Sequence, residues 1–265
     1  MAVNSFRVAR RLLLVSLLVA LYVSPVPSSG QFGPLSDSAS APQARSQEEL
    51  DGYLQIVAES KDKEVINMVN GFAAQFPKSA LLGVAYQYQM HAYQRLGDFD
   101  GTLSAGRKSL VDAPNNLDTL LTLAPEIANH FSDRPDRAQL LAEADKYALL
   151  ALDGLEKVTP PHEISLDDWE KQKRAMECRA HEVLGIVAVS QGSRESAILE
   201  FQTVVQLAAS PTGAQYFRLA VALASDGKDR EAADYFHRAA NLGPEPVRQL
   251  ALRELDKHHS LKASP

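Results

Sequence analysis

The sequence has very little cysteine: Cys178 is the only one among 265 residues. An internal disulfide needs two cysteines, and a structural zinc ion needs four ligands. Cys178 and His181 have the i, i+3 spacing of two ligands on one helix, but no second Cys or His pair with ligand spacing accompanies them. The fold must therefore be stabilised by packing, and we expect no metal ion and no other cofactor.

The short motifs of common enzyme classes are also missing. There is no Gly-x-Ser-x-Gly elbow of a serine hydrolase, and neither glycine-rich phosphate loop, GxGxxG or GxxxxGK(S/T), is present. Acidic pairs such as Asp167-Asp168 fall at expected helix N-termini, where they stabilise the helix dipole. An enzyme would need a pocket that gathers several acids or histidines, and the sequence shows no such gathering. We therefore expect no enzymatic activity.

Positive charge is scarce. The chain has 27 Lys and Arg against 33 Asp and Glu, a net charge of −6. An acidic protein repels the phosphate backbone, and no Lys/Arg cluster with interleaved aromatic residues appears. Binding to nucleic acid is therefore not expected.

Long apolar runs are absent except near the N-terminus. There Arg7, Arg10 and Arg11 precede a mostly apolar run, residues 12–23, which is 12 residues long. A membrane-spanning helix needs about 20 apolar residues, so this run is short. Prolines and small residues follow, up to Gly30. This pattern is typical of a cleavable secretory signal over residues 1–30. Its loss would remove three Arg and no acid, which would change the net charge from −6 to −9.

The alternative interpretation is an uncleaved membrane anchor, which would be the chain's only contact with a membrane. In either case we expect an exported protein, in the periplasm or outside the cell, or held at the inner membrane by the retained segment. Residues 31–46 are rich in Ser, Ala, Pro and Gln, and we expect them to form a flexible linker.

Turning to what is present, one pattern occurs twice between residues 178 and 244. The equivalent positions are all 35 residues apart. A fixed period of this length indicates stacked supersecondary units. The recurring pairs are Leu184/Leu219, Gly185/Ala220, Gly192/Gly227, Ala197/Ala232 and Phe201/Phe236.

Each copy divides into two helices at its glycine. In the second copy, Tyr216, Leu219 and Leu223 lie on one apolar helix face before the turn at Asp226-Gly227. A second apolar face, with Ala232 and Phe236, follows the turn. No strand-like alternation of useful length occurs in the sequence, so the fold class is all-α.

These residues resemble the tetratricopeptide repeat (TPR), a helix–turn–helix of about 34 residues. In the last copy, the positions that carry the resemblance are Tyr216, Leu219, Ala220, Leu223, Ala232, Phe236, Ala239 and Pro244. The resemblance implies a right-handed superhelical solenoid of about five repeats, in which the first helix of each repeat lines a concave groove. It also implies binding of a protein or peptide partner.

The rest of the chain is divided on the same pattern. Residues 47–155 are predicted to form three hairpins, the first degenerate and the third with an insertion in its turn at 132–135. Residues 156–165, with two adjacent prolines, form a loop that separates two sub-arrays, and 166–244 contain two repeats. A capping helix and tail occupy 245–265. Gly106, at the place of the usual aromatic residue, predicts looser packing of the second hairpin.

The family's register places nine candidate partner-binding residues in the groove. The N-terminal half is polar and the C-terminal half apolar; the alternative is that these side chains are consumed by packing between helices. Gln87 and His91 replace the lysine and asparagine of the family's carboxylate clamps, so a clamp of that kind is not expected. The nine are Gln87, His91, Gln94, Arg179, Glu182, Ile186, Val189, Phe217 and Val221.

Together these features predict a non-enzymatic scaffold or adaptor of the bacterial cell envelope that binds a partner segment in the groove. The alternative is a subunit of an envelope assembly or secretion complex, held by an uncleaved N-terminal anchor. Trp169 is either a contact for that partner or, more simply, a covered residue at a repeat junction.

Overall fold

The computed structural model describes residues 42–161 and 164–262, with side chains up to Lys257. Within these ranges every regular element is an α-helix, so the predicted all-α class is confirmed. The predicted signal segment, residues 1–30, and most of the predicted linker lie outside the described residues.

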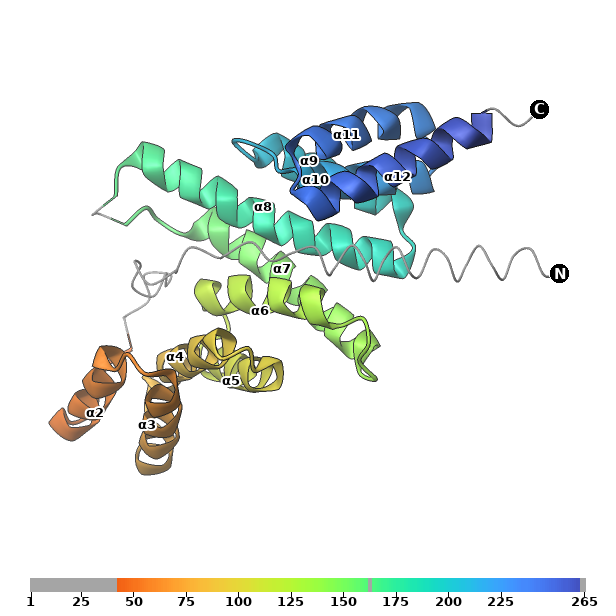
Figure 1. The fold of residues 1–265 in the computed structure, drawn as a ribbon. Helices are drawn as coiled ribbons and strands as arrows, with labels where there is room; N and C mark the ends of the chain where they lie inside the picture. Colours follow the sequence, from red (N-terminus) through yellow and green to blue (C-terminus); the bar gives the residue numbers. More distant parts are fainter. Residues whose placement is uncertain (1–41, 162–163, 263–265) are drawn as a thin grey trace.

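Three helical hairpins form the N-terminal part of the array (Figure 1). In each, two antiparallel helices are joined by a short turn, and the hairpins follow one another along the chain. Their helices are α2 (Gln47–Ala58) and α3 (Asp62–Gln75), α4 (Leu82–Arg95) and α5 (Phe99–Asp112), and α6 (Leu117–His130) and α7 (Arg137–Lys157).

Two further hairpins and a single helix complete the array. The hairpin that follows the two adjacent prolines begins with a helix of 26 residues, which Ser165 caps by accepting a hydrogen bond from the backbone N–H of Asp168. The helices are α8 (Leu166–Gln191), α9 (Arg194–Leu207), α10 (Gly213–Ser225), α11 (Asp229–Leu242) and α12 (Glu245–Lys262).

The glycines that divide the two sequence copies form the turns of their hairpins. Gly192 has a φ of 78° and Gly227 a φ of 80°, in the left-handed region that favours glycine. A Cβ on either would meet no atom within 4 Å, so the backbone conformation, rather than lack of space, requires glycine here. The 35-residue spacing thus identified both turns.

Small residues let helices approach closely. A Cβ on Gly185 of α8 would lie 2.5 Å from Cε1 of Phe201, which packs against it from α9. The predicted looser packing at Gly106 is wrong. A Cβ there would lie 2.6 Å from Cδ2 of Leu123, because this leucine of α6 packs directly against the glycine.

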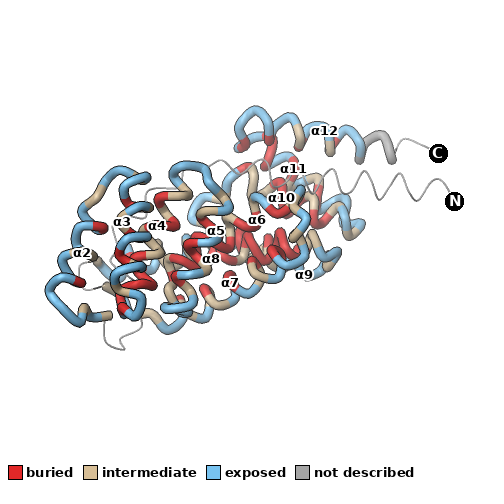
Figure 2. The backbone as a smooth tube through the Cα atoms, turned by 90° about the horizontal axis from the view of Figure 1, so that it is seen from below, coloured by how far each residue is buried: buried red, intermediate tan, exposed pale blue. Residues whose placement is uncertain are grey.

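One hydrophobic core runs through most of the array (Figure 2). It extends from Met90 in α4 to Leu255 in α12 and passes across the 156–165 loop without interruption. A separate, smaller cluster joins the first hairpin to α4 and includes Ile56, Val69 and Phe72. The division of the core therefore lies near the N-terminal hairpin rather than at the adjacent prolines.

The predicted insertion at 132–135 is held against the preceding hairpin. Arg134 lies over the ring of Phe99, 5.1 Å from its centroid, and its guanidinium is 2.9 Å from Asp100 at the start of α5. A second ion pair joins Arg134 to Asp136 within the same turn. These contacts fix the corner between α6 and α7.

Candidate protein-binding surface

A row of polar side chains links the first helices of the second and third hairpins. Nε2 of His91 lies 2.6 Å from Oδ2 of Asp118 in α6, and Gln87 donates a hydrogen bond of 2.8 Å to the same oxygen. Asn116, the N-cap of α6, donates in turn to the side-chain oxygen of Gln87. These side chains are half-buried, so each keeps some surface toward solvent.

The row continues along both helices. Gln94, about two turns after Gln87 on α4, donates to Oε2 of Glu126 at 3.3 Å. Gln87, His91 and Gln94 thus all face α6 and share one surface. The sequence had not indicated that Asp118 and Glu126 of α6 are the partners, because these residues are not separated from the residues of α4 by the repeat period.

Arg179 connects α8 to α6. Its Nη2 donates a hydrogen bond of 3.0 Å to the backbone oxygen of Leu121. This oxygen has no ordinary helical partner, because the residue four positions later is Pro125, which has no N–H. A side chain from the next hairpin therefore supplies the bond that the proline removes.

Glu182 and Arg218 form an ion pair between α8 and α10. Both side chains are buried, Arg218 being only 2% exposed, and Nη1 of Arg218 donates to Oε1 of Glu182. Sequence reasoning placed Glu182 in the groove but missed Arg218. Glu182 and Arg218 are 36 residues apart, one more than the repeat period. This spacing could have indicated that the two side chains meet between consecutive repeats.

The apolar candidates differ in accessibility. Phe217 is 2% exposed and lies 5.7 Å from Phe236 of its own hairpin, centroid to centroid, and Ile186 is also buried. These two side chains, like Glu182, are consumed by packing and offer a partner little surface. Val189 and Val221 are half-buried and retain accessible atoms.

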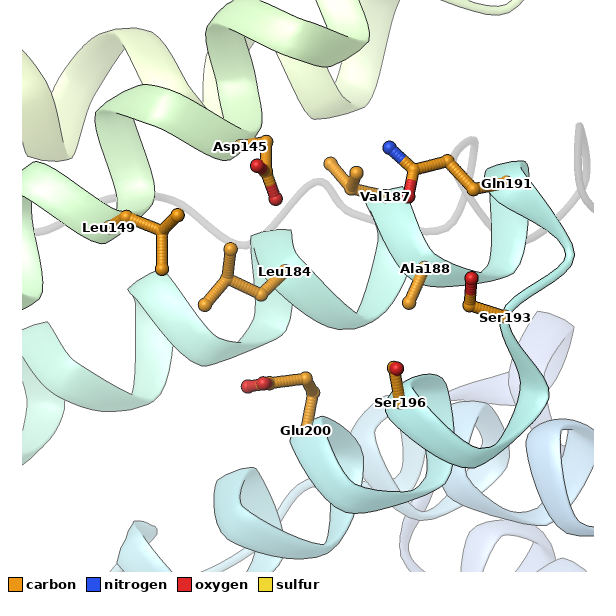
Figure 3. A pocket seen from close by; sticks show the side chains of 9 residues that line it. All are labelled: Asp145, Leu149, Leu184, Val187, Ala188, Gln191, Ser193, Ser196 and Glu200. Carbon is orange, nitrogen blue, oxygen red and sulfur yellow. The ribbon is translucent and has the colours of Figure 1, made fainter.

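A shallow pocket of ≈ 200 Å³ lies on the other side of α8 (Figure 3). Leu184, Ala188 and Gln191 line it, on the helix face opposite that of Glu182 and Val189. Asp145 of α7 and Glu200 of α9 supply carboxylates at its edge. Nδ1 of His181 lies 2.7 Å from Oε2 of Glu200, so this carboxylate already has a partner.

Within the described residues, no group of three or more His, Cys, Asp or Glu side chains could hold a metal ion. Burial, with the negative charge of Glu182, raises the pKa of the Cys178 thiol to about 11, which disfavours the reactive thiolate. Trp169 is buried, as the simpler interpretation of this residue required. None of the helices described is long and apolar enough to span a bilayer.

No protein-family model and no curated protein matches the sequence. Among solved structures, a crystal structure of a thermophilic TPR protein from Thermus thermophilus is similar, with 18% identity and a TM-score of 0.43. The match covers 79% of this chain and 98% of that one. The consecutive helical hairpins of the described residues fit a TPR-like repeat array, the architecture that the residue pattern indicated.

Proposed function

We propose that the chain is a protein–protein interaction scaffold that binds a segment of a partner protein along the first helices of its hairpins. The observation that carries this proposal is the polar row joining α4, α6 and α8 through Gln87, His91, Gln94 and Arg179. These contacts lie at two junctions between hairpins, and an extended segment that follows the first helices would pass both of them.

The chemistry of this surface favours a partner with mixed contacts. Amide, imidazole and carboxylate groups on α4 and α6 can donate and accept hydrogen bonds with a partner's backbone and polar side chains. Farther along, the half-buried Val189 and Val221 provide small apolar contacts. Buried Ile186 and Phe217 support the helices beneath this surface rather than contacting the partner.

Site-specific photo-crosslinking tests the location of the binding surface. A photoreactive amino acid is placed at Gln94 or Val189, and at Leu199 of α9 as a control, whose side chain is 63% exposed. The chain is irradiated in cells, and crosslinked proteins are identified by mass spectrometry. Groove binding predicts a common adduct at Gln94 and Val189 that is absent at Leu199. The same adduct at all three positions would contradict it.

The N-terminal sequence supports a location in the bacterial envelope, where residues 1–30 act as a cleaved export signal. The second candidate, a subunit of an envelope complex, requires that the apolar run at 12–23 is retained as an anchor. Mass measurement of the chain isolated from periplasmic and membrane fractions distinguishes them. Loss of about the first 30 residues supports the export signal, whereas an intact chain in the membrane supports the anchor.

A further inference from the structure

The shallow pocket beside α8 lies between the second helices of two consecutive hairpins. Its floor is α8, and its walls are α7 and α9 (Figure 3). Leu184 and Ala188 form an apolar base, which Leu149 of α7, 52% exposed, extends. The volume of ≈ 200 Å³ is below the ~300–1,000 Å³ of pockets that enclose drug-sized molecules. The pocket therefore has room for one long side chain rather than for a peptide segment.

The pocket is acidic. Of the described residues that line it, only Asp145 and Glu200 are charged. One oxygen of Glu200 is already bonded to His181. Asp145 points from α7 toward the pocket (Figure 3), is half-buried, and has no hydrogen-bond or ion-pair partner among the described residues. A carboxylate that is partly removed from water without a partner is stabilised when a cation binds it.

The charges that border the pocket leave Asp145 without a partner. Lys146 follows it on α7, and Arg194 and Glu195 begin α9; all three are exposed, and no ion pair joins any of them to a described residue. The adjacent Arg194 and Glu195 are opposite in sign, so pocket and border together stay negative when His181 is neutral. Two ion pairs lie farther along α7 and α8: Asp153 with Lys157 and Lys173 with Glu177.

The preceding pair of second helices shows how the chain itself fills a gap of this kind. Arg107 reaches from α5 to α7, where its Nε and Nη2 each donate a hydrogen bond of 2.9 Å to a different carboxylate oxygen of Glu143. Between α7 and α9, the described residues that line the pocket include no Lys or Arg. An arginine from another molecule could therefore bind Asp145 there, since a guanidinium donates several hydrogen bonds in one plane.

We infer that the pocket binds one arginine side chain of a partner protein, with the guanidinium against Asp145 and the aliphatic carbons over Leu149 and Leu184. The hydroxyl groups of Ser193 and Ser196 line the opposite side and offer further acceptors (Figure 3). A site for one side chain binds weakly on its own and adds to the affinity of a partner that has a second contact. It lies apart from the groove of the proposed function, so either can fail without the other.

NMR titration of the ¹⁵N-labelled full chain with an acetylated and amidated Gly-Arg-Gly peptide tests the site. We expect saturable shifts of the amide signals around Asp145, Leu149 and Leu184. The same peptide with citrulline, which has the shape of arginine but no charge, should bind about tenfold more weakly. Absence of saturable shifts with millimolar arginine peptide overturns the inference, as does equal binding of the two peptides. This comparison uses only the wild-type chain, so it does not depend on how a variant folds.

A matched pair of substitutions tests the location. Asp145→Asn removes the unpaired charge with little change of shape and should raise the dissociation constant of the arginine peptide about tenfold. Glu195→Gln removes an exposed charge on α9 that does not line the pocket, and it should leave the dissociation constant unchanged. An equal effect of both substitutions would show attraction by the overall negative charge and would overturn the assignment to the pocket.

Two further ligands test the chemical class. A Gly-Lys-Gly peptide should bind more weakly, because an ammonium group lacks the planar donors of a guanidinium. Free L-arginine should also bind more weakly than the arginine peptide, because its own carboxylate is repelled by the acidic pocket. Tighter binding of free arginine would assign the pocket to a small molecule and overturn the assignment to a protein side chain. Equal binding of the lysine and arginine peptides would contradict recognition of a guanidinium.

Discussion

Nη2 of Arg179 in α8 donates a hydrogen bond of 3.0 Å to the backbone oxygen of Leu121 in α6. Within α6 that oxygen would normally accept from the N–H of residue 125, which is a proline. The helix continues through Pro125 to His130, and the missing bond is replaced from the neighbouring hairpin. The proline in α6 and the arginine in α8 are therefore energetically linked, although they belong to different hairpins.

Arg179→Ala should destabilise the fold. It leaves the Leu121 oxygen without its partner, which is expected to lower the free energy of unfolding by about 1–3 kcal/mol. Pro125→Ala restores an N–H that can donate to the same oxygen. In a chain that carries Pro125→Ala, Arg179→Ala should therefore lower the free energy of unfolding by a smaller amount. A double-mutant cycle measured by urea denaturation gives the coupling. If the two changes were additive, the proposed link between Arg179 and Pro125 would be wrong.

The buried pair of Glu182 and Arg218 leads to a second prediction. Arg218→Met leaves the Glu182 carboxylate buried without its ion-pair partner, and removal of one member of such a pair costs about 3–5 kcal/mol. Glu182→Met with Arg218→Met removes both charges and should be more stable than the Arg218→Met variant. Thermal or chemical unfolding of the three variants provides the measurement. A double variant that is less stable than the Arg218→Met variant would show that an unpaired Glu182 carboxylate is not penalised at this site, which contradicts the prediction.

How far the sequence predicted these features depends on their physical origin. The 35-residue period identified the hairpins and the turns at Gly192 and Gly227, because both follow from local propensity and helix periodicity. It could not establish that Phe217 is turned toward Phe236, since the neighbouring helices determine which side chains at a junction are buried. Arg218 was missed for the same reason: its charge is evident in the sequence, but its burial depends on the position of α8.

The effect of a single unusual residue also depends on neighbouring helices that the sequence does not reveal. Gly106 lacks the aromatic side chain of other repeats, and the sequence alone indicated a looser hairpin. The third hairpin supplies Leu123 at that point, so the space is filled by a residue from the next repeat. The candidate residues Gln87, His91 and Gln94 on α4 came from the register of the family that the sequence resembles, whereas their hydrogen-bond partners Asp118 and Glu126 emerged only from the packing of α6.

Gly185→Ala tests close packing within the fourth hairpin. The added methyl group would lie within 2.5–2.8 Å of three atoms of the Phe201 ring, and overpacking of this kind costs about 1–3 kcal/mol. A shift of the ring that accommodates the methyl group would give no loss of stability. The equivalent residue of the next repeat is already alanine, so Ala220→Gly is the matched control in the opposite sense. Ala220→Gly should lower the free energy of unfolding by about 1 kcal/mol, because glycine has greater backbone freedom in the unfolded chain than alanine.

The Cys178 thiol should be nearly unreactive in the folded chain. Burial raises its pKa to about 11, Sγ lies 3.5 Å from Nε2 of Gln215, and the side chain is buried. Since the thiolate is the nucleophile, modification at pH 8 should be slower by roughly 200-fold than for a thiol with the usual pKa of ~8.5. Timed labelling with a thiol reagent, in buffer and in denaturant, measures the difference. Rapid labelling of the native chain would show that the site opens readily.

The same raised pKa predicts how stability changes at high pH. The unfolded chain loses the Cys178 proton near pH ~8.5, whereas the folded chain retains it up to about pH 11. Between these values the unfolded state binds fewer protons, so the free energy of unfolding must fall as the pH rises. Cys178→Ala removes this contribution, and its stability should decrease less steeply than that of the wild-type chain between about pH 8.5 and 10. Parallel slopes for the two proteins in denaturation measured across that interval would mean that the folded and unfolded thiols titrate alike.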